Sequence, residues 1–382
     1  MYFWTIAFKN LFRRKIRSIL TCLGIAVAIG AVVALVGIAN GFERGFVEVF
    51  EVRGIDLIVV EGGITEQLTS SMDQAVAQQI RELPGVKAVA SMLLEVLVFE
   101  KENMMGVMVQ GWETDSFLFH DLKIVAGCAL QPNAKGQAML GALLAKNMSK
   151  QIGDTIEIDR EPFKIVGIFE SFNVFENGSA VVPLPELQRV MVRPNQVTAM
   201  AVILQEGPNK AHLQKNLCQQ VEQLHNAAGK QLRLSALPAR DYVNSTLQIR
   251  MAQAMAWVTS TIALVIGIIG MLNTMMTSVL ERTKEIGILR AIGWRRSRVM
   301  HMILSEAVLQ SLLGACMGIL GAIVLIKGLS QSRMVNGFIQ SDLSWIVLGQ
   351  GLAIAVLVGL MGGLYPAWCA SRLAPTEAIR HD

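Results

Sequence analysis

Four long apolar runs constrain this chain more than any other feature of its sequence. About 20 apolar residues in a helix are enough to cross the roughly 30 Å hydrocarbon core of a bilayer. Only 17% of the residues are charged, against about 25% in a typical soluble domain. The sequence therefore predicts an integral membrane protein. We assign its spanning helices to residues 19–40, 251–280, 302–327 and 345–368.

The first run has an alternative interpretation as a cleaved signal peptide. Residues 1–18 carry five basic residues and no acidic one, and Gly37-Ile38-Ala39 is an acceptable cleavage site. The charge-free run at residues 19–38 is longer than the apolar region of about 7–15 residues that is usual in signal peptides. We therefore favour a span, preceded at residues 1–18 by an amphipathic helix lying in the membrane interface.

Residues 41–250 are polar and show the alternation and turn signals of a folded domain. Strands are predicted at residues 55–60, 86–99 and 104–110, and a hairpin at residues 155–169. Ser71 is expected to cap a helix that runs to residue 83, and a second helix is expected at residues 210–227, before a strand at 232–234. The predicted fold is four transmembrane α-helices with an N-terminal interfacial helix. A large α+β extracytoplasmic domain lies between the first and second spans.

The distribution of Lys and Arg predicts the orientation in the membrane. Basic residues cluster in residues 1–18 and 281–301, whereas the loop at 328–344 has only Arg333. Loops rich in Lys and Arg stay on the cytoplasmic side. Both termini and residues 281–301 are therefore expected in the cytoplasm, and residues 41–250 outside. Membrane topology explains these basic clusters better than nucleic-acid binding does.

A charged stretch, ERTKEIGILRAIGW at residues 281–294, joins the second and third spans. A helix here would place Ile286, Leu289 and Gly293 along one stripe. Such a helix could lie on lipid or dock in a groove of a partner protein. Glycine inside a helix is unfavourable by about 1 kcal/mol relative to alanine, so close approach of a partner would explain Gly287 and Gly293.

The same stretch resembles the cytoplasmic segment of the FtsX/MacB-type permeases of ABC transporters, which has the pattern E-R-x-x-E-I-G-x-x-[RK]-A-x-G. The closing segment, with Tyr365-Pro366-Ala367, is similar to the family's tail, although Cys369 stands where a basic residue is usual. The resemblance implies that the stretch is the coupling helix, which docks on an ATPase. The matching residues are Glu281, Arg282, Glu285, Ile286, Gly287, Arg290, Ala291 and Gly293.

The resemblance also implies the partners and the mode of action. A separate ABC ATPase would bind ATP and Mg²⁺, since the sequence contains no Walker A motif. A second permease subunit would complete the dimer, and a periplasmic adaptor and an outer-membrane channel are further expected partners. The location would be the bacterial inner membrane. The family is thought to work by mechanotransmission, here for export or extraction of a drug, peptide, lipid or lipoprotein.

Two other functions stay open at the level of sequence. An FtsX-like regulator would transmit ATPase-driven force to a cell-wall hydrolase and would not transport a substrate. A secondary transporter is disfavoured because four spans show no inverted repeat with broken helices. No catalytic motif and no Cys/His metal spacing occurs in the sequence, so we expect neither an enzyme nor a cofactor in this chain.

Three residues of the third span are candidates for packing or pairing. Glu306 is its one acidic residue, and intramembrane acids are often functional. Pairing with Arg282 or Arg298 is the favoured role here. Gly314 and Gly318 form a GxxxG pair that allows close helix approach, within the subunit or at a dimer interface. Outside the spans, Cys128 and Cys218 could form a disulfide.

Overall fold

The computed structural model describes residues 15–64, 70–131, 135–171, 173–225, 229–330 and 344–373. The chain divides into two compact units. The first, the helical unit, comprises Met1–Gly41, Ala252–Leu329 and Ser341–Asp382, and the second, the sheet domain, comprises Phe42–Met251 with Ser330–Gln340. Most of the predicted interfacial helix, most of the outer loop and the end of the tail lie outside the described residues.

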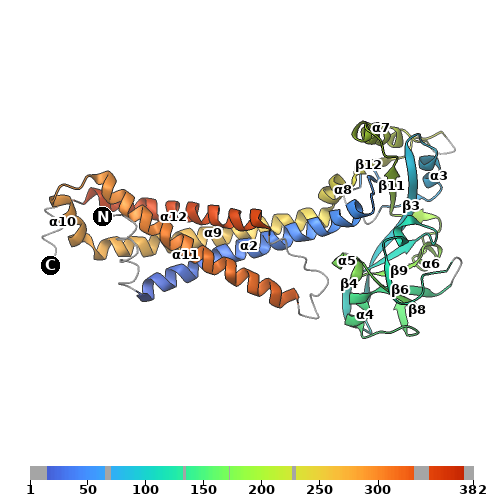
Figure 1. The fold of residues 1–382 in the computed structure, drawn as a ribbon, viewed down its shortest axis with the longest axis horizontal. Coiled ribbons are helices and arrows are strands. Elements are labelled where there is room, and N and C mark those ends of the chain that lie inside the picture. The colour runs from blue at the N-terminus through green and yellow to red at the C-terminus, as the bar shows by residue number, and fades with distance from the viewer. Residues whose placement is uncertain are drawn as a thin grey trace. The chain divides into compact units, whose positions relative to one another are not determined.

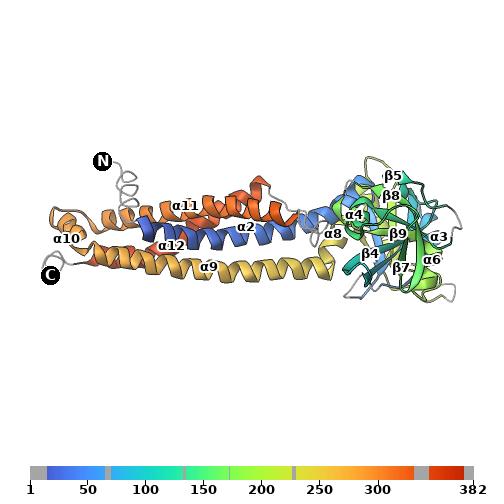
Figure 2. The ribbon, with the colours of Figure 1, turned by 90° about the horizontal axis from the view of Figure 1, so that it is seen from below.

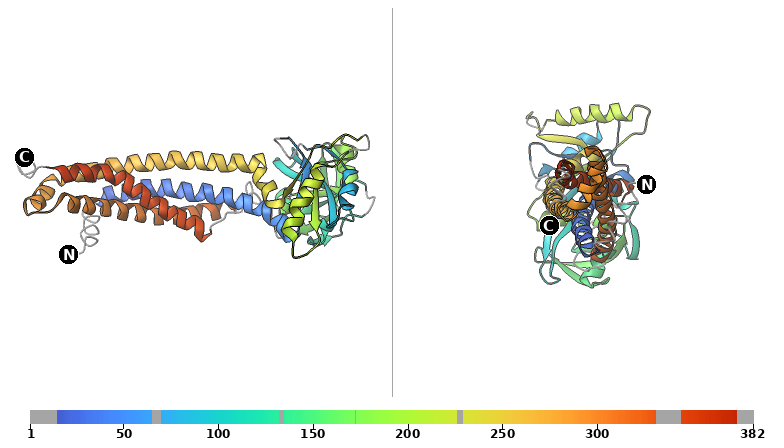
Figure 3. Two further views of the ribbon diagram at one scale, coloured as in Figure 1. Left: turned by 90° about the horizontal axis from the view of Figure 1, so that it is seen from above. Right: turned by 90° about the vertical axis from the view of Figure 1, so that its left-hand side faces the viewer.

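The described part of the helical unit consists of four long helices and one short one. The helices that are long and apolar enough to cross a membrane number four within the described residues, and they lie alongside one another in Figures 1, 2 and 3. This confirms the predicted set of spans. Their bounds are α2 (Lys15–Val52), α9 (Leu247–Glu281), α11 (Arg296–Ser330) and α12 (Trp345–Arg372), with the short α10 (Thr283–Ala291) between α9 and α11.

The outward faces of these helices are apolar, as lipid contact requires. Ile266 on α9 is 65% exposed and Val324 on α11 is 71% exposed, while Ile29 on α2 and Ala315 on α11 are fully buried. A helix that is apolar on all sides is typical of a membrane span. The helical unit therefore presents an apolar surface both to its interior and to its surroundings.

The first span helix continues past its predicted end at residue 40. Charged residues begin at Glu43, but the helix runs unbroken to Val52. Phe42, Phe46 and Phe50 recur every four residues and so lie on one face of the helix. The sheet domain covers this face, because all three side chains pack against one of its hydrophobic clusters. The charge pattern predicted where the apolar run ends and could not predict where the helix ends.

The sheet domain is organised around a ten-stranded mixed sheet with the order β12-β1-β11-β3-β4-β9-β6-β8-β5, in which β7 pairs with β8. The strands are β1 (Leu57–Glu61), β3 (Val86–Phe99), β4 (Met104–Trp112), β5 (Lys123–Gly127), β6 (Gln137–Gly141), β7 (Thr155–Ile158), β8 (Glu161–Glu170), β9 (Ala180–Pro183), β11 (Ala199–Leu204) and β12 (Leu234–Pro238). The short strands β2 (Met72–Asp73) and β10 (Gln196–Val197) form a second sheet.

Both faces of the large sheet are buried. Successive residues of a strand point to opposite faces, and in β1 Leu57 and Val59 join one hydrophobic cluster while Ile58 and Val60 join the other. Helices α3, α4, α6 and α7 cover the first face, and the end of α2, helix α8 and the start of α9 cover the second. Their bounds are α3 (Val76–Arg81), α4 (Ala142–Met148), α6 (Leu184–Val190), α7 (Lys210–Glu222) and α8 (Ala239–Ser245).

The predicted mixed α/β domain between the first two spans is confirmed, but several local predictions were wrong. The helix expected from Ser71 begins at Val76, because Met72 and Asp73 pair with β10 instead. The second helix ends at Glu222, and the following strand begins at Leu234. The strands β5, β6 and β9 were not predicted.

Candidate functional site

The stretch between α9 and α11 forms the short helix α10, with nine residues. Glu281 is the last residue of α9, and Arg282 is the N-cap residue of α10. Figure 1 shows α10 at the end of the helical unit where α9 ends. The stretch thus forms a short helix between two turns, set apart from both spans.

Gly293 lies beyond the end of this helix. The last helical residue is Ala291, and Gly293 has φ 103°, the left-handed region that favours glycine. Its N–H donates to the Arg290 carbonyl, and the Trp294 N–H donates to the Leu289 carbonyl, both at 3.1 Å. These two bonds are the Schellman motif that terminates helices. Helix termination therefore explains Gly293, and the expectation that it lies inside the helix was wrong.

One face of α10 is exposed and partly apolar. Ile288 is 51% exposed, and Ile292, just after the helix, is 74% exposed. Lys284 and Glu285 are also exposed, and their spacing from Ile288 places all three on one side of the helix. We call Lys284, Glu285, Ile288, Ala291 and Ile292 the α10 outer face. The apolar stripe predicted from the sequence was a different one, because Ile286 is 3% exposed and packs inward.

An ion pair connects the start of α10 to the third span. Arg282 Nη1 donates to Glu306 Oε2 at 3.1 Å. Only 11% of the Arg282 side chain and 6% of the Glu306 side chain are exposed. Charges this buried need a close partner, because each loses its hydration. The structure therefore pairs Glu306 with Arg282, one of the two arginines considered.

A second polar contact connects the end of α10 to the last span. Arg290 Nη1 donates to the carbonyl of Ser371, near the end of α12. Together with the Arg282–Glu306 pair, this contact holds both ends of α10 against the helical unit. Neither contact involves a residue of the α10 outer face.

The family-like residues of this stretch thus fall into two groups. Those that contact or face the chain's own helices are Arg282, Ile286, Gly287 and Arg290. Those that are exposed are Glu281, Glu285, Ala291 and Gly293. The sequence motif alone did not distinguish residues that contact the chain's own helices from residues that are exposed.

Gly314 and Gly318 bring α11 against α2 within one subunit. A Cβ built at Gly318 would lie 2.4 Å from the Ala26 carbonyl oxygen, and one built at Gly314 would lie 2.8 Å from the Ile25 Cβ. Real Cβ atoms do not come so close, so only glycine fits at these positions. Both glycines therefore pack within the subunit, against α2.

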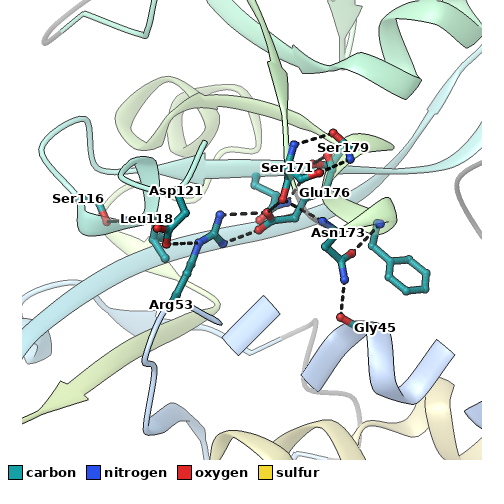
Figure 4. Close-up of polar contacts among 12 residues, drawn as sticks. Gly45, Arg53, Ser116, Leu118, Asp121, Ser171, Asn173, Glu176 and Ser179 are labelled. Atoms are coloured by element: carbon teal, nitrogen blue, oxygen red, sulfur yellow. Dashed lines mark hydrogen bonds and ion pairs between the residues drawn. The ribbon is translucent and has the colours of Figure 1, made fainter. Parts of the chain in front are cut away.

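A buried polar network in the sheet domain holds the chain just after α2 (Figure 4). Arg53 donates two hydrogen bonds to the Glu176 carboxylate, at 2.5 Å and 3.0 Å. Ser171 Oγ donates to the same carboxylate at 2.6 Å. Asn173 Nδ2 donates to the Gly45 carbonyl of α2 at 2.6 Å. The network therefore fixes the end of α2 to the loop that contains α5 (Val174–Asn177).

Aromatic side chains reinforce this attachment. Phe42 of α2 packs edge-on against Phe175, with ring centroids 4.9 Å apart, and the tilted ring of Phe46 packs against Phe175 at 4.6 Å. Phe50 packs edge-on against Tyr242 of α8 at 5.9 Å. Burial raises the pKa of Tyr242 to about 12. Sequence analysis missed this site, although the regular spacing of the phenylalanines after the apolar run was a signal for it.

The two cysteines of the sheet domain do not form the disulfide considered from the sequence. Cys128 and Cys218 are free thiols. Cys128 follows β5 and Cys218 lies on α7, which packs on β12, so the two residues sit at opposite ends of the large sheet. No cluster of three metal-ligating side chains occurs in the part of the chain that the structure describes.

Comparison with known proteins identifies two family domains. The MacB-like periplasmic core domain matches residues 18–219, and the FtsX-like permease C-terminal domain matches residues 257–375. The periplasmic region of MacB from Actinobacillus actinomycetemcomitans is a similar solved structure, with a TM-score of 0.39 and 16% identity, covering 53% of this chain and 98% of that one.

Two relatives each match nearly the whole of this chain. The macrolide export ATP-binding/permease protein MacB of Haemophilus ducreyi is 25% identical, over 99% of this chain and 56% of that protein. The uncharacterized ABC transporter permease YvrN of Bacillus subtilis is 27% identical, over 99% of this chain and 98% of that protein. The chain thus spans just over half of the ATP-binding relative and nearly all of YvrN. Because the first domain match alone covers more than half of its length, the chain belongs to the MacB-like and FtsX-like family of ABC transporter permeases.

Proposed function

We propose that this chain is a permease subunit that couples ATP hydrolysis by a separate ATPase to movement of its sheet domain. The observation that carries the proposal is the α10 outer face. It exposes two isoleucines beside charged residues on a helix whose two ends are tied to α11 and α12. Burying an exposed isoleucine against a partner is favourable by about 1.5–3 kcal/mol.

The working unit is a dimer of permeases with two ATPase subunits in the bacterial inner membrane. The basic clusters at residues 1–18 and 281–301 support a cytoplasmic location for α10 and both termini. The sheet domain then lies on the outer side. This arrangement places the α10 outer face on the side of the membrane where ATP is available.

The output of the cycle is export or extraction of a drug, peptide, lipid or lipoprotein substrate. The Haemophilus ducreyi relative, a macrolide export ATP-binding/permease protein, supports export. A periplasmic adaptor and an outer-membrane channel complete the pathway. ATP and Mg²⁺ belong to the ATPase subunit.

Substitutions in the α10 outer face test the proposal. Ile288→Asp and Ile292→Asp should each abolish co-purification of the ABC ATPase encoded nearest the gene, because a carboxylate would be buried in an apolar contact. Val192→Asp is the matched control, since Val192 is 83% exposed on the sheet domain. Wild-type ATPase binding and stimulated ATPase activity in both α10 variants would refute docking at this face.

Thiol labelling in spheroplasts tests the orientation. Cys128 is exposed in the sheet domain, and Ser297 is exposed beside α10. An impermeant maleimide should label a variant that retains only Cys128. It should not label a cysteine-free variant carrying Ser297→Cys until the membrane is permeabilised. The opposite labelling pattern would mean that the protein has the reverse orientation in the membrane.

A further inference from the structure

The sheet domain contains a cavity of about 330 Å³ between the end of α2, the sheet and helix α8. This volume is within the range of small-molecule sites, which starts at about 300 Å³. Every residue that lines the cavity belongs to the sheet domain. The cavity is therefore a feature of one compact unit and does not depend on the placement of the helical unit.

Three structural elements present regular faces to the cavity. From α2 come Phe42, Phe46 and Phe50, which share one helical face. From β3 and β4 come alternate residues, including Leu94 and Trp112, as the two-residue period of a strand requires. The walls are thus mostly aromatic and aliphatic, which favours an apolar occupant.

Two residues that line the cavity have buried hydrogen-bond donors without acceptors. Trp112 Nε1 and Arg53 Nε are buried and have no hydrogen-bond partner among the described residues. Asp121 Oδ2 lies 4.0 Å from Arg53 Nε, close enough for an ion pair but beyond hydrogen-bond distance. Trp112 is 1% exposed. A buried donor left unpaired is unfavourable, so an acceptor on a ligand would be favoured here.

The charge balance indicates a neutral ligand. The Arg53 guanidinium already forms a two-point ion pair with Glu176, and only 2% of the Arg53 side chain and 5% of the Glu176 side chain are exposed. An anion would have to compete with Glu176 and the part-exposed Asp121 for Arg53, and a cation would face the Arg53 guanidinium. The free donors therefore suit the carbonyl oxygen of an uncharged group such as an ester.

Two observations indicate how a ligand enters the cavity and where it comes from. Val96 lines the cavity and is 49% exposed, so the cavity is open at this strand position. Two of its walls belong to α2 and α9, helices whose other parts are apolar enough to span a membrane. Molecules dissolved in the bilayer are the source that matches an apolar wall built from such helices.

We infer that this cavity binds a neutral fatty-acyl ester, with the acyl chain among the phenylalanines and the ester carbonyl accepting from Trp112 and Arg53. The inference does not depend on ATPase docking at α10, because ligand binding to the sheet domain can be measured without an ATPase. Binding involves no covalent step.

Photolabelling of the full chain in nanodiscs tests this site. The probe is a decanoylglycerol that carries a diazirine on its acyl chain, and labelled peptides are mapped by mass spectrometry. Labelling should occur in peptides covering residues 92–112 and 239–249, and an excess of plain decanoylglycerol should suppress it at least fivefold. Background labelling of the span peptides by lipid contact should not be suppressed. Labelling confined to the spans would overturn the inference.

Three variants locate the ligand within the cavity. Leu94→Trp, which fills the cavity, should reduce the suppressible labelling at least tenfold, and Met108→Phe serves if Leu94→Trp fails to fold. Val98→Trp is the matched control, because Val98 lies on the same strand, is 59% exposed and does not line the cavity. Trp112→Phe removes one donor and should weaken binding about fivefold. Equal labelling in Leu94→Trp and Val98→Trp would refute binding in the cavity. Full binding in Trp112→Phe, or equal labelling by a diazirine-bearing decane, would refute recognition of the ester.

Discussion

Replacing Gly318 by alanine should separate the first and third span helices. The new Cβ would lie 2.4 Å from the Ala26 carbonyl oxygen, whereas a relaxed carbon–oxygen contact is at least about 3.3 Å. Helices α2 and α11 would have to move apart by about 0.9 Å, the difference between these two distances. A gap of this size loses about a quarter to a half of the dispersion energy of each pair of contacting atoms.

The magnitude follows from two opposing effects. Overpacking a well-packed site costs about 1–3 kcal/mol, while alanine gains up to about 1 kcal/mol over glycine in a helix. Gly321→Ala on the same helix is the matched control, because its Cβ would have no described heavy atom within 4 Å. The helix-propensity gain is then common to both variants. We expect Gly318→Ala to be less stable than Gly321→Ala by about 2 kcal/mol.

Thermal unfolding of the full chain in nanodiscs measures this difference. At about 2–4 °C per kcal/mol for a unit of this size, Gly318→Ala should melt about 4–8 °C below Gly321→Ala. Cross-linking between cysteines placed on α2 and α11 gives a second readout of helix separation. Equal melting temperatures for the two variants would show that the α2–α11 contact is not as close as described here.

Three further perturbations test other buried groups. Glu306→Leu should lower stability by about 3–5 kcal/mol because it leaves the Arg282 charge unpaired, whereas Glu306→Gln keeps an acceptor and should lose only about 1–2 kcal/mol; equal melting temperatures of the two variants would contradict this. Tyr242 has its pKa raised from 10.0 to about 12, so below pH 10 both states are protonated, and above it the unfolded state releases its proton first. Stability should therefore fall by about 1.4 kcal/mol per pH unit between these values, and Tyr242→Phe should remove that part of the slope; an unchanged slope would exclude the shift. For the buried Arg53–Glu176 pair, Arg53→Met or Glu176→Met alone should cost about 3–5 kcal/mol and the double variant much less, as measured by denaturation of the full chain; additive losses would contradict the coupling.

The parts of the fold that could be predicted are those fixed by local composition. The spans were found because each apolar run is long enough to cross a bilayer. The strand at Val86–Phe99 was found because its fourteen residues carry a strong local pattern. The short strands β6 and β9 are buried on both faces, so they lack the alternation that identifies a half-buried strand.

The parts that could not be predicted depend on distant partners. Ser71 looks like a helix cap, but its hydroxyl donates to Gln196, more than a hundred residues away. Similarly, the sequence of residues 281–294 predicted a helix and contained the family's motif. Which face of that helix is buried, with Ile286 on it, depends on the position of the neighbouring helices. Arg53 and Glu176 are far apart in sequence, and no local pattern could pair them.

The attachment of α10 has a consequence for how force would reach the spans. This helix is connected to α9 and α11 through the chain and the Arg282–Glu306 pair, and to α12 through Arg290. A force applied at Ile288 would therefore be distributed over three helices, α9, α11 and α12. In the proposed coupling, partner affinity would depend on the α10 outer face and the transfer of force on Arg282 and Arg290, so one could be lost while the other is kept. An Arg290→Met variant would bind its partner normally but would transmit less of the applied force to α12 than to α9 and α11.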